Sequence, residues 1–411
     1  MRIAIIGGGI AGASAAYELA DRADVTVFEQ ESICGYHSTG RSAALFTECY
    51  GDSIVRRLAM GSRSFLEEPP AGFVDEPLVR PRSLLFVGTG SQEPALSASL
   101  DEYRSMVPTV TPVAADRARE LCPVLDPQVV VGGILEPGAM DIDVHALHLA
   151  YQRGARDRGA RILTDAAVTG LERTGTGWMI RTAAAAHDAE VVVNAAGAWA
   201  DRVATMAGAR PVGLVPKRRT AFTFRPPEGS SHQRWPMVLD VDELWYFRPE
   251  GIHLLASPAD ETPMDPCDVR HDEADVALAI ERIESVTTMS IRSVEHAWAG
   301  LRSFVGDHRP VNGWDPEADG FYWLAGQGGF GIKTSPAMAR YAAGMILDGS
   351  PPSDLDAAGL GGGGRVGRRS GRLGRDPGDT AMRRQPKSHE LSPQLLGPAR
   401  LGGHPPRAQR P

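Results

Sequence analysis

The sequence lacks an apolar run of about 20 residues, the length that a membrane-spanning helix needs. It has only four cysteines in 411 residues, and their scattered spacing is not that of a disulfide framework or a zinc site. The eleven histidines form no cluster with metal-ligand spacing. We therefore predict reduced thiols, no metal site and no membrane span.

The N-terminus also lacks a secretory signal. Met1-Arg-Ile-Ala-Ile-Ile6 leads directly into glycines, and this run is too short for the hydrophobic region of a signal peptide. Its length and composition are those of a buried strand. We therefore expect a cytoplasmic protein.

Charge is distributed unevenly along the chain. The net charge is −8, yet residues 361–411 contain ten arginines and one lysine against three acidic residues. The rest of the chain is therefore strongly acidic, which is unfavourable for binding nucleic acid. Residues 351–411 are rich in Arg, Gly and Pro and poor in apolar residues, so we predict a disordered basic tail. An out-of-frame translation product would have the same character, and resequencing the 3′ end of the gene would identify one.

A glycine fingerprint follows the first strand. Gly7, Gly9 and Gly12 have the G-x-G-x-x-G spacing at the start of an alanine-rich helix, and Glu29 ends the next strand. In a β-α-β unit these glycines form the turn, admit a pyrophosphate and pack the helix on the strand, while the acid accepts from ribose hydroxyls. The helix N-terminus favours the phosphates. The pattern predicts a site for FAD or NAD.

A second glycine-rich turn, Gln327-Gly-Gly-Phe-Gly331, lies near the far end of the chain, before a helix expected to begin with Ser335 as N-cap and Pro336 in its first turn. Residues 217–257 between the two turns alternate as in an antiparallel sheet. We predict an α/β protein, in which a discontinuous Rossmann-like FAD-binding domain carries an inserted α+β substrate domain built on a mostly antiparallel sheet. The expected ranges are 1–80, 141–215 and 300–350 for the first domain, and 81–140 and 216–299 for the second.

The stretch from Gly35 to Phe46 distinguishes between the two cofactors. It is rich in small and hydroxylated residues and comes soon after Glu29. NAD does not require such a segment, whereas the ribityl chain and isoalloxazine of FAD need close backbone beyond the pyrophosphate. Residues 38–42 can supply hydroxyl, backbone and cationic donors there. This stretch favours FAD and leaves an NAD-dependent dehydrogenase as an alternative.

Several motifs together resemble the D-amino-acid-oxidase-like FAD oxidoreductases. Within that family the chain looks most similar to the bacterial D-arginine dehydrogenases, over about residues 1–348. The motifs are the N-terminal fingerprint, His37-Ser-Thr-Gly-Arg-Ser-Ala-Ala44, Asn194-Ala-Ala-Gly-Ala-Trp199, Lys217-Arg-Arg219, Trp298-Ala-Gly-Leu-Arg-Ser303 and Gln327-Gly-Gly-Phe-Gly-Ile-Lys-Thr334.

The resemblance implies noncovalent FAD and oxidation of a D-amino acid, with hydride transfer from Cα to flavin N5 and hydrolysis of the imino acid to a 2-oxo acid and ammonia. The expected cofactor contacts are Gly7, Gly9, Ala11, Gly12, Glu29, Gln30, Ser38, Thr39, Gly40, Arg41, Ser42, Ala43, Ala44, Leu45, Val168, Ala196, Gly197, Gly328, Gly329, Phe330, Gly331, Ile332, Lys333 and Thr334.

The resemblance also assigns catalytic residues. Arg219 and Arg302 match the family's carboxylate-binding positions, and a planar guanidinium can bond both carboxylate oxygens. Tyr50 and Tyr246 match tyrosines that donate to the same carboxylate. Lys333, at a helix start, is expected to stabilise the negative charge that develops at the flavin N1–C2=O region; the D-arginine dehydrogenases have glutamine there.

Two departures from the D-arginine dehydrogenases concern specificity. Leu45 stands where they have histidine, and Leu84 stands where they have the glutamate that binds a guanidinium. A buried cationic side chain would then lack its partner. We therefore expect a pocket for neutral or hydrophobic D-amino acids. The expected pocket residues are Leu45, Thr47, Leu84, Met237 and Gly300, whose carbonyl can accept from the substrate amine.

Three alternatives stay open at this point. A glycine, sarcosine or D-amino acid oxidase of the same family would pass electrons to O₂, and a noncatalytic flavin-binding protein would not be reduced by substrate. An NAD-dependent dehydrogenase would be colourless. The electron acceptor, whether a quinone, a dye-like acceptor or O₂, does not follow from the sequence.

Overall fold

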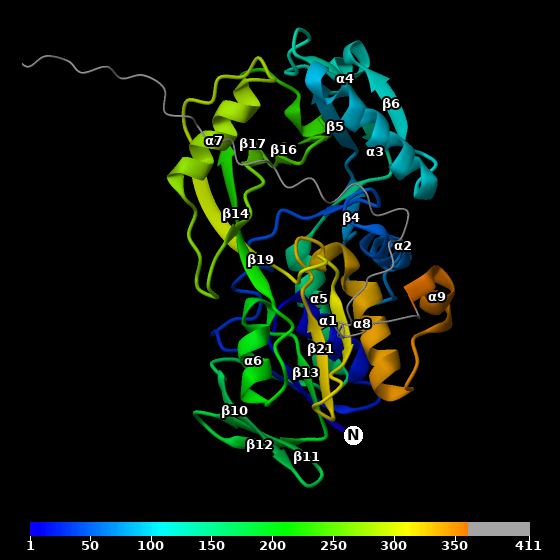
Figure 1. Cartoon of the computed structure of the whole chain (residues 1–411), viewed down its shortest axis with the longest axis vertical. Helices are drawn as coiled ribbons and strands as arrows, with labels where there is room; N and C mark the ends of the chain where they lie inside the picture. Colours follow the sequence, from blue (N-terminus) through cyan, green and yellow to red (C-terminus); the bar gives the residue numbers. More distant parts are fainter. Residues whose placement is uncertain (361–411) are drawn as a thin grey trace, which may run out of the picture. The chain divides into compact units, whose positions relative to one another are not determined.

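The computed structural model describes residues 1–360. Its first layer is a six-stranded sheet that is parallel except at one edge, where β20 runs antiparallel to β21 (Figure 1). The strands, in spatial order, are β20 (Val311–Trp314), β21 (Phe321–Ala325), β13 (Val191–Asn194), β1 (Arg2–Ile6), β2 (Asp24–Phe28) and β9 (Arg161–Leu163).

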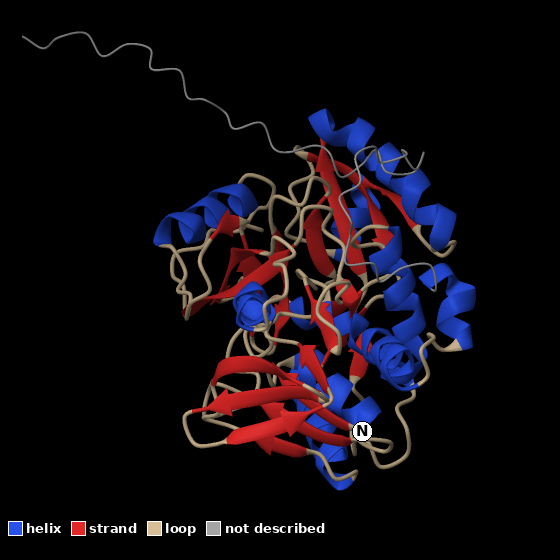
Figure 2. Ribbon diagram, turned by 60° about the horizontal axis from the view of Figure 1, so that its bottom comes forward, coloured by secondary structure: helices blue, strands red, loops and turns tan. Residues whose placement is uncertain are grey.

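Both faces of this sheet are buried, as parallel sheets require. Ile3 and Ile5 of β1 belong to a core with α1 (Ile10–Leu19), α5 (Val144–Asp157) and α8 (Gly331–Leu347). Ala4 and Ile6 point to the other face, which is covered by α6 (Ala200–Met206) and a three-stranded antiparallel sheet, β10 (Val168–Thr174), β11 (Gly177–Thr182) and β12 (Ala186–Ala189) (Figure 2).

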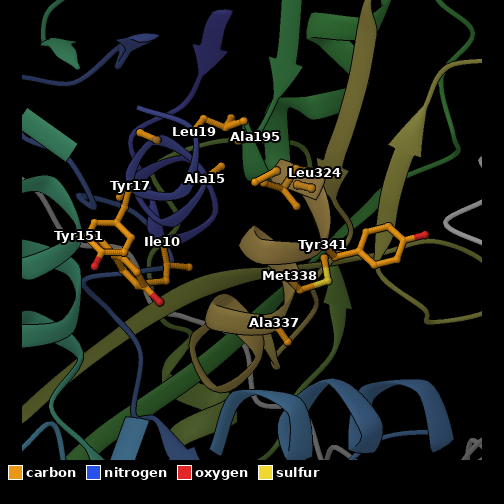
Figure 3. Close-up of a cluster of buried hydrophobic side chains, with 14 of the residues drawn as sticks. Ile10, Ala15, Tyr17, Leu19, Tyr151, Ala195, Leu324, Ala337, Met338 and Tyr341 are labelled. Carbon is orange, nitrogen blue, oxygen red and sulfur yellow. The ribbon is translucent and has the colours of Figure 1, made fainter. Parts of the chain in front are cut away.

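The helix-covered face has a dense core of apolar side chains. Figure 3 shows side chains of this core, among them Ile10 and Leu19 of α1, Met338 of α8, Leu324 of β21 and Ala195, which directly follows β13. α2 (Ser53–Glu67) packs on α8 from the outside. This packing brings the glycine turns before α1 and α8 to the same edge of the sheet.

The second large sheet has nine strands and is antiparallel except where β15 runs parallel to β5. Along its path lie β18 (Thr262–Pro263), β14 (Val215–Phe224), β17 (His253–Ser257), β16 (Tyr246–Glu250), β15 (Met237–Asp240), β5 (Leu84–Thr89), β7 (Val130–Glu136) and β6 (Thr111–Ala114), and β19 (His296–Phe304) pairs with β14. The helices α3 (Glu93–Met106), α4 (Ala115–Leu121) and α7 (Glu273–Glu284) pack against this sheet.

A small sheet lies between these parts, with β8 (Met140–Ile142) between β3 (Leu45–Phe46) and β4 (Val79–Pro81). The predicted α/β class, with a Rossmann-like sheet and a mostly antiparallel second sheet, is confirmed. The exact domain limits stay a proposal, and β19 runs unbroken across the expected limit at 299/300.

Two sequence predictions are corrected here. α8 begins at Gly331, four residues before the expected cap. Pro336 lies inside the helix, where it has no N–H for the carbonyl of Ile332, and the hydroxyl of Ser335 donates to that carbonyl instead, at 3.0 Å. The predicted tail also began too early, because α9 (Ser353–Leu355) and a further helical turn (Asp356–Leu360) follow, with Leu355 buried in the core. Residues 361–411 lie outside the described part of the chain.

Candidate active site

Two positions, Gly7 in the turn before α1 and Gly12 in the first turn of α1, fit only glycine. Gly7 has a φ of +106°, and a Cβ there would lie 2.5 Å from the carbonyl oxygen of Ala195. A Cβ on Gly12 would lie 1.9 Å from the carbonyl oxygen of Gly7. Gly9 has no side chain to cap the N-terminus of α1, and the Thr39 hydroxyl accepts from the Ile10 N–H at 3.0 Å; the other N–H groups of the first turn can bind a phosphate.

Glu29 lies beside the turn, as predicted. Its carboxylate is 7% exposed and accepts from the N–H groups of Gly8, at 2.8 Å, and Glu31, at 2.9 Å. These bonds fix the carboxylate at the end of β2, next to the fingerprint. Each carboxylate oxygen has a further acceptor site, so Glu29 can still accept from a ribose hydroxyl.

A long cleft starts at this turn and has a volume of about 960 Å³, including its solvent-open part. It brings together segments far apart in the sequence: 9–11, 38–43, 195–198, 300–303 and 324–332. The predicted cofactor residues that line it are Gly9, Ala11, Ser38, Thr39, Arg41, Ser42, Ala43, Gly197, Gly328, Gly329, Gly331 and Ile332. The size and the glycine lining fit an extended dinucleotide.

Other predicted cofactor residues lie elsewhere. Ala44, Leu45 and Lys333 line a second cavity. Gln30, Gly40, Val168, Ala196, Phe330 and Thr334 line neither cavity, and their contact with the cofactor stays a prediction. Arg41 lines the cleft, but its guanidinium is bonded to Asp268 and to the carbonyls of Val269 and Ala299. Arg41 therefore ties its segment to β19 and is not a free cationic donor.

The second cavity shares seven lining residues with the cleft, so the two spaces adjoin. Its volume is about 650 Å³, including its solvent-open part. Both spaces are lined by Ser42, Ala43, Arg219, Tyr246, Arg302, Gly329 and Ile332. Tyr50, Thr47 and Lys333 line the second cavity alone. The structure thus brings all five predicted catalytic residues into one cavity beside the cofactor cleft.

The two arginines are held on neighbouring strands. In the β14–β19 ladder Arg219 faces Gly300 and Lys217 faces Arg302, so both guanidinium groups project from the same face of the sheet. Arg219 is 8% exposed and donates to the Asp260 carbonyl at 2.9 Å and to Glu261 at 3.3 Å. Burial opposes a charge-stabilising effect at Arg302, whose pKa is raised by interaction with Tyr50 and Tyr246. The ladder therefore sets the spacing of two cations in the cavity.

Lys333 connects α8 to the loop before α2. Its ammonium donates to the carbonyls of Thr47 and Tyr50, both at 2.7 Å. Burial lowers the pKa of Lys333 to about 8, and Glu136 opposes this effect. Two of the three ammonium donors are thus engaged by backbone.

Glu136 at the end of β7 was missed by sequence reasoning. It is fully buried and accepts from the Thr47 hydroxyl, at 2.5 Å, and from the Glu48 N–H, at 2.8 Å. Burial raises the pKa of Glu136, while the bond from Thr47 lowers it. Glu136 therefore fixes the loop that carries Thr47 and Tyr50.

Glu243 was also missed, and it lines the second cavity. It sits in the turn between β15 and β16 with a φ of +60°, which is uncommon outside glycine. The carboxylate of Asp240 accepts from the N–H groups of Asp242 and Leu244 and so fixes this turn. The Glu243 side chain is open to solvent within the cavity. Only the pairing of β15 with β16, which the sequence does not display, brings it there.

The remaining wall of the cavity is apolar. It is formed by Leu45, Leu84, Met237, Leu239 and Ala259, of which three were predicted. Gly300 lines the cofactor cleft and not this cavity. Four of the five residues predicted for the substrate pocket thus lie together, and Gly300 lies on the side of the cleft; their contact with a substrate stays a prediction.

A glycine-lined cleft next to a cavity that contains two arginines is the arrangement expected of an oxidoreductase with a dinucleotide cofactor. Residues 2–345 match the profile of the DAO family, described as FAD dependent oxidoreductase, so the chain belongs to that family. FAD is its cofactor, and the cleft, with glycines where a Cβ would close the turn, fits it. The alternative of NAD is thereby set aside.

Relatives of known function match most of this chain. The mitochondrial dimethylglycine dehydrogenase of Rattus norvegicus is 26% identical over 375 residues, which cover 85% of this chain and 43% of that protein. The mitochondrial sarcosine dehydrogenase of Mus musculus is 26% identical over 253 residues, covering 58% of this chain and 27% of that protein. The chain thus spans less than half the length of these curated relatives.

Solved structures share the fold. Glycine oxidase from Geobacillus kaustophilus has a TM-score of 0.75 and 23% identity, covering 88% of this chain and 98% of that one. L-Proline dehydrogenase from P. horikoshii also has a TM-score of 0.75, with 22% identity, and the match covers 85% and 93% of the two chains. The predicted family is confirmed, whereas the finer likeness to the D-arginine dehydrogenases stays a prediction.

Residues 1–360 bear on two of the predicted absences. No helix in this part of the chain is both long and apolar enough to cross a membrane. No group of three or more His, Cys, Asp or Glu side chains there could hold a metal ion.

Proposed function

We propose that this protein oxidises the CH–NH bond of D-amino acids with FAD and so yields an imino acid, which water converts to a 2-oxo acid and ammonia. The observation that carries the proposal is the convergence of Arg219, Arg302, Tyr50 and Tyr246 in one cavity beside the cofactor cleft. Bound FAD supplies the hydride acceptor.

The protein's own residues bind and orient the substrate. Arg219 and Arg302 hold the carboxylate through charge-assisted bonds, and the hydroxyls of Tyr50 and Tyr246 donate to the same group. The carbonyl of Gly300, on the cofactor side, accepts from the amine. Because the carboxylate and the amine are both held, Cα is directed towards the cleft.

Lys333 is proposed to stabilise negative charge near the cleft. It lines the cavity at the start of α8, where the helix N-terminus adds a favourable dipole. Its two bonds to the loop carbonyls hold the ammonium in place. Such a preorganised cation needs little rearrangement during the reaction.

The apolar wall supports a preference for neutral or hydrophobic side chains. Leu45 and Leu84 are buried and line the cavity, and neither offers a partner to a guanidinium or ammonium. We expect a higher kcat/KM for D-Leu or D-Met than for D-Arg or D-Lys. A clear preference for D-Arg would show that another group sets specificity.

A second candidate is the oxidation of N-methylated glycines. It is favoured by the relatives named dimethylglycine dehydrogenase and sarcosine dehydrogenase, the first of which covers 85% of this chain. The same carboxylate site would serve these substrates, since they differ from a D-amino acid at the nitrogen and at Cα.

One experiment tests both candidates. The FAD-loaded protein is mixed without oxygen with single D- and L-amino acids, glycine, sarcosine and dimethylglycine, and bleaching of the flavin band is followed. Bleaching by D-amino acids supports the first candidate, and bleaching by N-methylglycines alone supports the second. A flavin that no compound reduces would refute both and indicate a noncatalytic protein. Peroxide formed per turnover in air then distinguishes an oxidase from a dehydrogenase.

A further inference from the structure

Hydride transfer from an amino acid requires a neutral amine, because the nitrogen lone pair drives electrons towards Cα. An amino acid at neutral pH carries an ammonium, so a proton must leave before or during the reaction. Among the described residues that line the cleft and the cavity, Glu243 is the one carboxylate, and no histidine accompanies it. Arg219 and Arg302 stay protonated, and Lys333 donates to two carbonyls.

The turn that carries Glu243 is fixed from several sides. The Glu243 N–H donates to the Asp240 carbonyl at 2.8 Å, and the side chain of Gln92 donates to both Asp240 and Asp242. Arg282 donates to the Leu244 carbonyl at 2.6 Å. A non-glycine residue persists in the left-handed region only where its surroundings hold it. These bonds aim the Glu243 side chain at the cavity.

The Glu243 carboxylate makes no hydrogen bond within residues 1–360, and it interacts electrostatically with ionisable groups from other elements. They are Arg219 of β14, Arg302 of β19, Arg56 of α2, Lys333 of α8, Tyr103 of α3, and Tyr50 and Glu261 from loops. The Glu243 side chain keeps contact with solvent, but the cavity walls displace part of its water and so raise its pKa to about 7, an effect that Arg219 and Arg302 oppose. A group with such a pKa can both accept and release a proton near neutral pH.

Resting on the proposed function, we infer that Glu243 is the proton acceptor for the substrate ammonium. One N–H bond of the ammonium breaks, and its proton passes to a carboxylate oxygen of Glu243, which leaves the neutral amine with its lone pair. When FAD is bound, it would accept the hydride of Cα with its two electrons, and the neutral amine would thereby become a protonated imine. Glu243 returns its proton to solvent through the open part of the cavity.

The test is the pH dependence of anaerobic flavin reduction, measured as the reduction rate over the substrate dissociation constant. For the wild-type protein we expect this ratio to rise with pH through an ionisation near 7. Glu243→Gln is expected to lose that limb and to fall about 100-fold at pH 7, the usual contribution of a general base. The deficit should shrink at pH values where free substrate has already lost its ammonium proton. Glu243→Asp should restore part of the rate and the limb.

Controls separate this role from a structural one. Glu228→Gln changes an exposed glutamate on the loop after β14 and should leave the profile unchanged. Flavin content and an acetate titration report whether the cofactor site and the arginines are intact. A wild-type profile without a limb near pH 7 overturns the inference even if Glu243→Gln does not fold. A Glu243→Gln variant that keeps the wild-type pH profile also overturns the inference. If no compound reduces the wild-type flavin, the proposed function has failed instead.

Discussion

Replacing Gly329 by alanine tests whether the position of Arg302 determines substrate binding. A Cβ on Gly329 would lie 2.6 Å from Nη1 and 2.8 Å from Cζ of Arg302. Unstrained contacts are about 3.5 Å, so the guanidinium must move by roughly 1 Å. A misplacement of that size can cost about 100-fold in rate, equivalent to about 2.7 kcal/mol of transition-state stabilisation. We expect a fall of this order in kcat/KM.

The assay compares kcat/KM of Gly329→Ala and wild type for the best substrate of the panel, together with the Kd of acetate read from flavin absorbance. Weaker acetate binding with normal flavin content would locate the defect at Arg302. Gly175→Ala is the matched control, because Gly175 lies in the turn between β10 and β11 and its added Cβ would meet nothing within 4 Å. If Gly329→Ala keeps wild-type kcat/KM and acetate affinity, the assignment of Arg302 is wrong.

Three further predictions concern the cofactor turn, the carboxylate site and the buried lysine. Gly12→Ala should lose bound flavin and lower Tm, because its Cβ would lie 1.9 Å from the Gly7 carbonyl oxygen; absorbance spectra and thermal melts measure both. Arg302→Lys should lower kcat/KM about 10- to 100-fold, since an ammonium cannot replace two charge-assisted bonds worth about 1.5–3 kcal/mol; steady-state kinetics and acetate binding check this. Burial lowers the pKa of Lys333 from 10.5, the value taken for the unfolded chain, to about 8 in the folded protein. Between these two pH values the unfolded chain binds more protons than the folded protein, so the free energy of unfolding rises with pH, by about 3 kcal/mol in total. Urea unfolding from pH 7 to 10.5 should show this rise, and Lys333→Met should flatten it.

The sequence predicted those helices that have a capping residue and apolar residues at helical spacing. The helical spacing of apolar residues over 53–67 predicts a helix, and α2 spans Ser53–Glu67, where Asp52 caps it by accepting from the Val55 N–H. Asp143 likewise caps α5. α3 was missed, because Tyr103 is its only fully buried side chain and an apolar stripe was therefore lacking.

The sequence predicted those residues of the candidate site that match positions of the family. Arg219, Arg302, Tyr50, Tyr246 and Lys333 lie together in the cavity. Their roles stay predictions, because the structure gives positions and not chemistry.

The two acidic residues of the site were not predictable. Glu136 and Glu243 are placed by strand pairing between distant segments, which local patterns do not encode. Arg41 was expected to offer a cationic donor to the cofactor. It lines the cleft, but its guanidinium is bound by Asp268 and by backbone carbonyls from elsewhere in the chain, which local sequence does not reveal.

The ladder of β14 and β19 has a consequence for how this protein can vary. Backbone pairing keeps Arg219 and Arg302 on one side of the sheet, and side chains alternate sides with every residue. A single inserted or deleted residue upstream in either strand would turn one guanidinium away from the cavity. Natural variants should therefore change these strands by replacement alone, and differences in length should collect in the loops that join them.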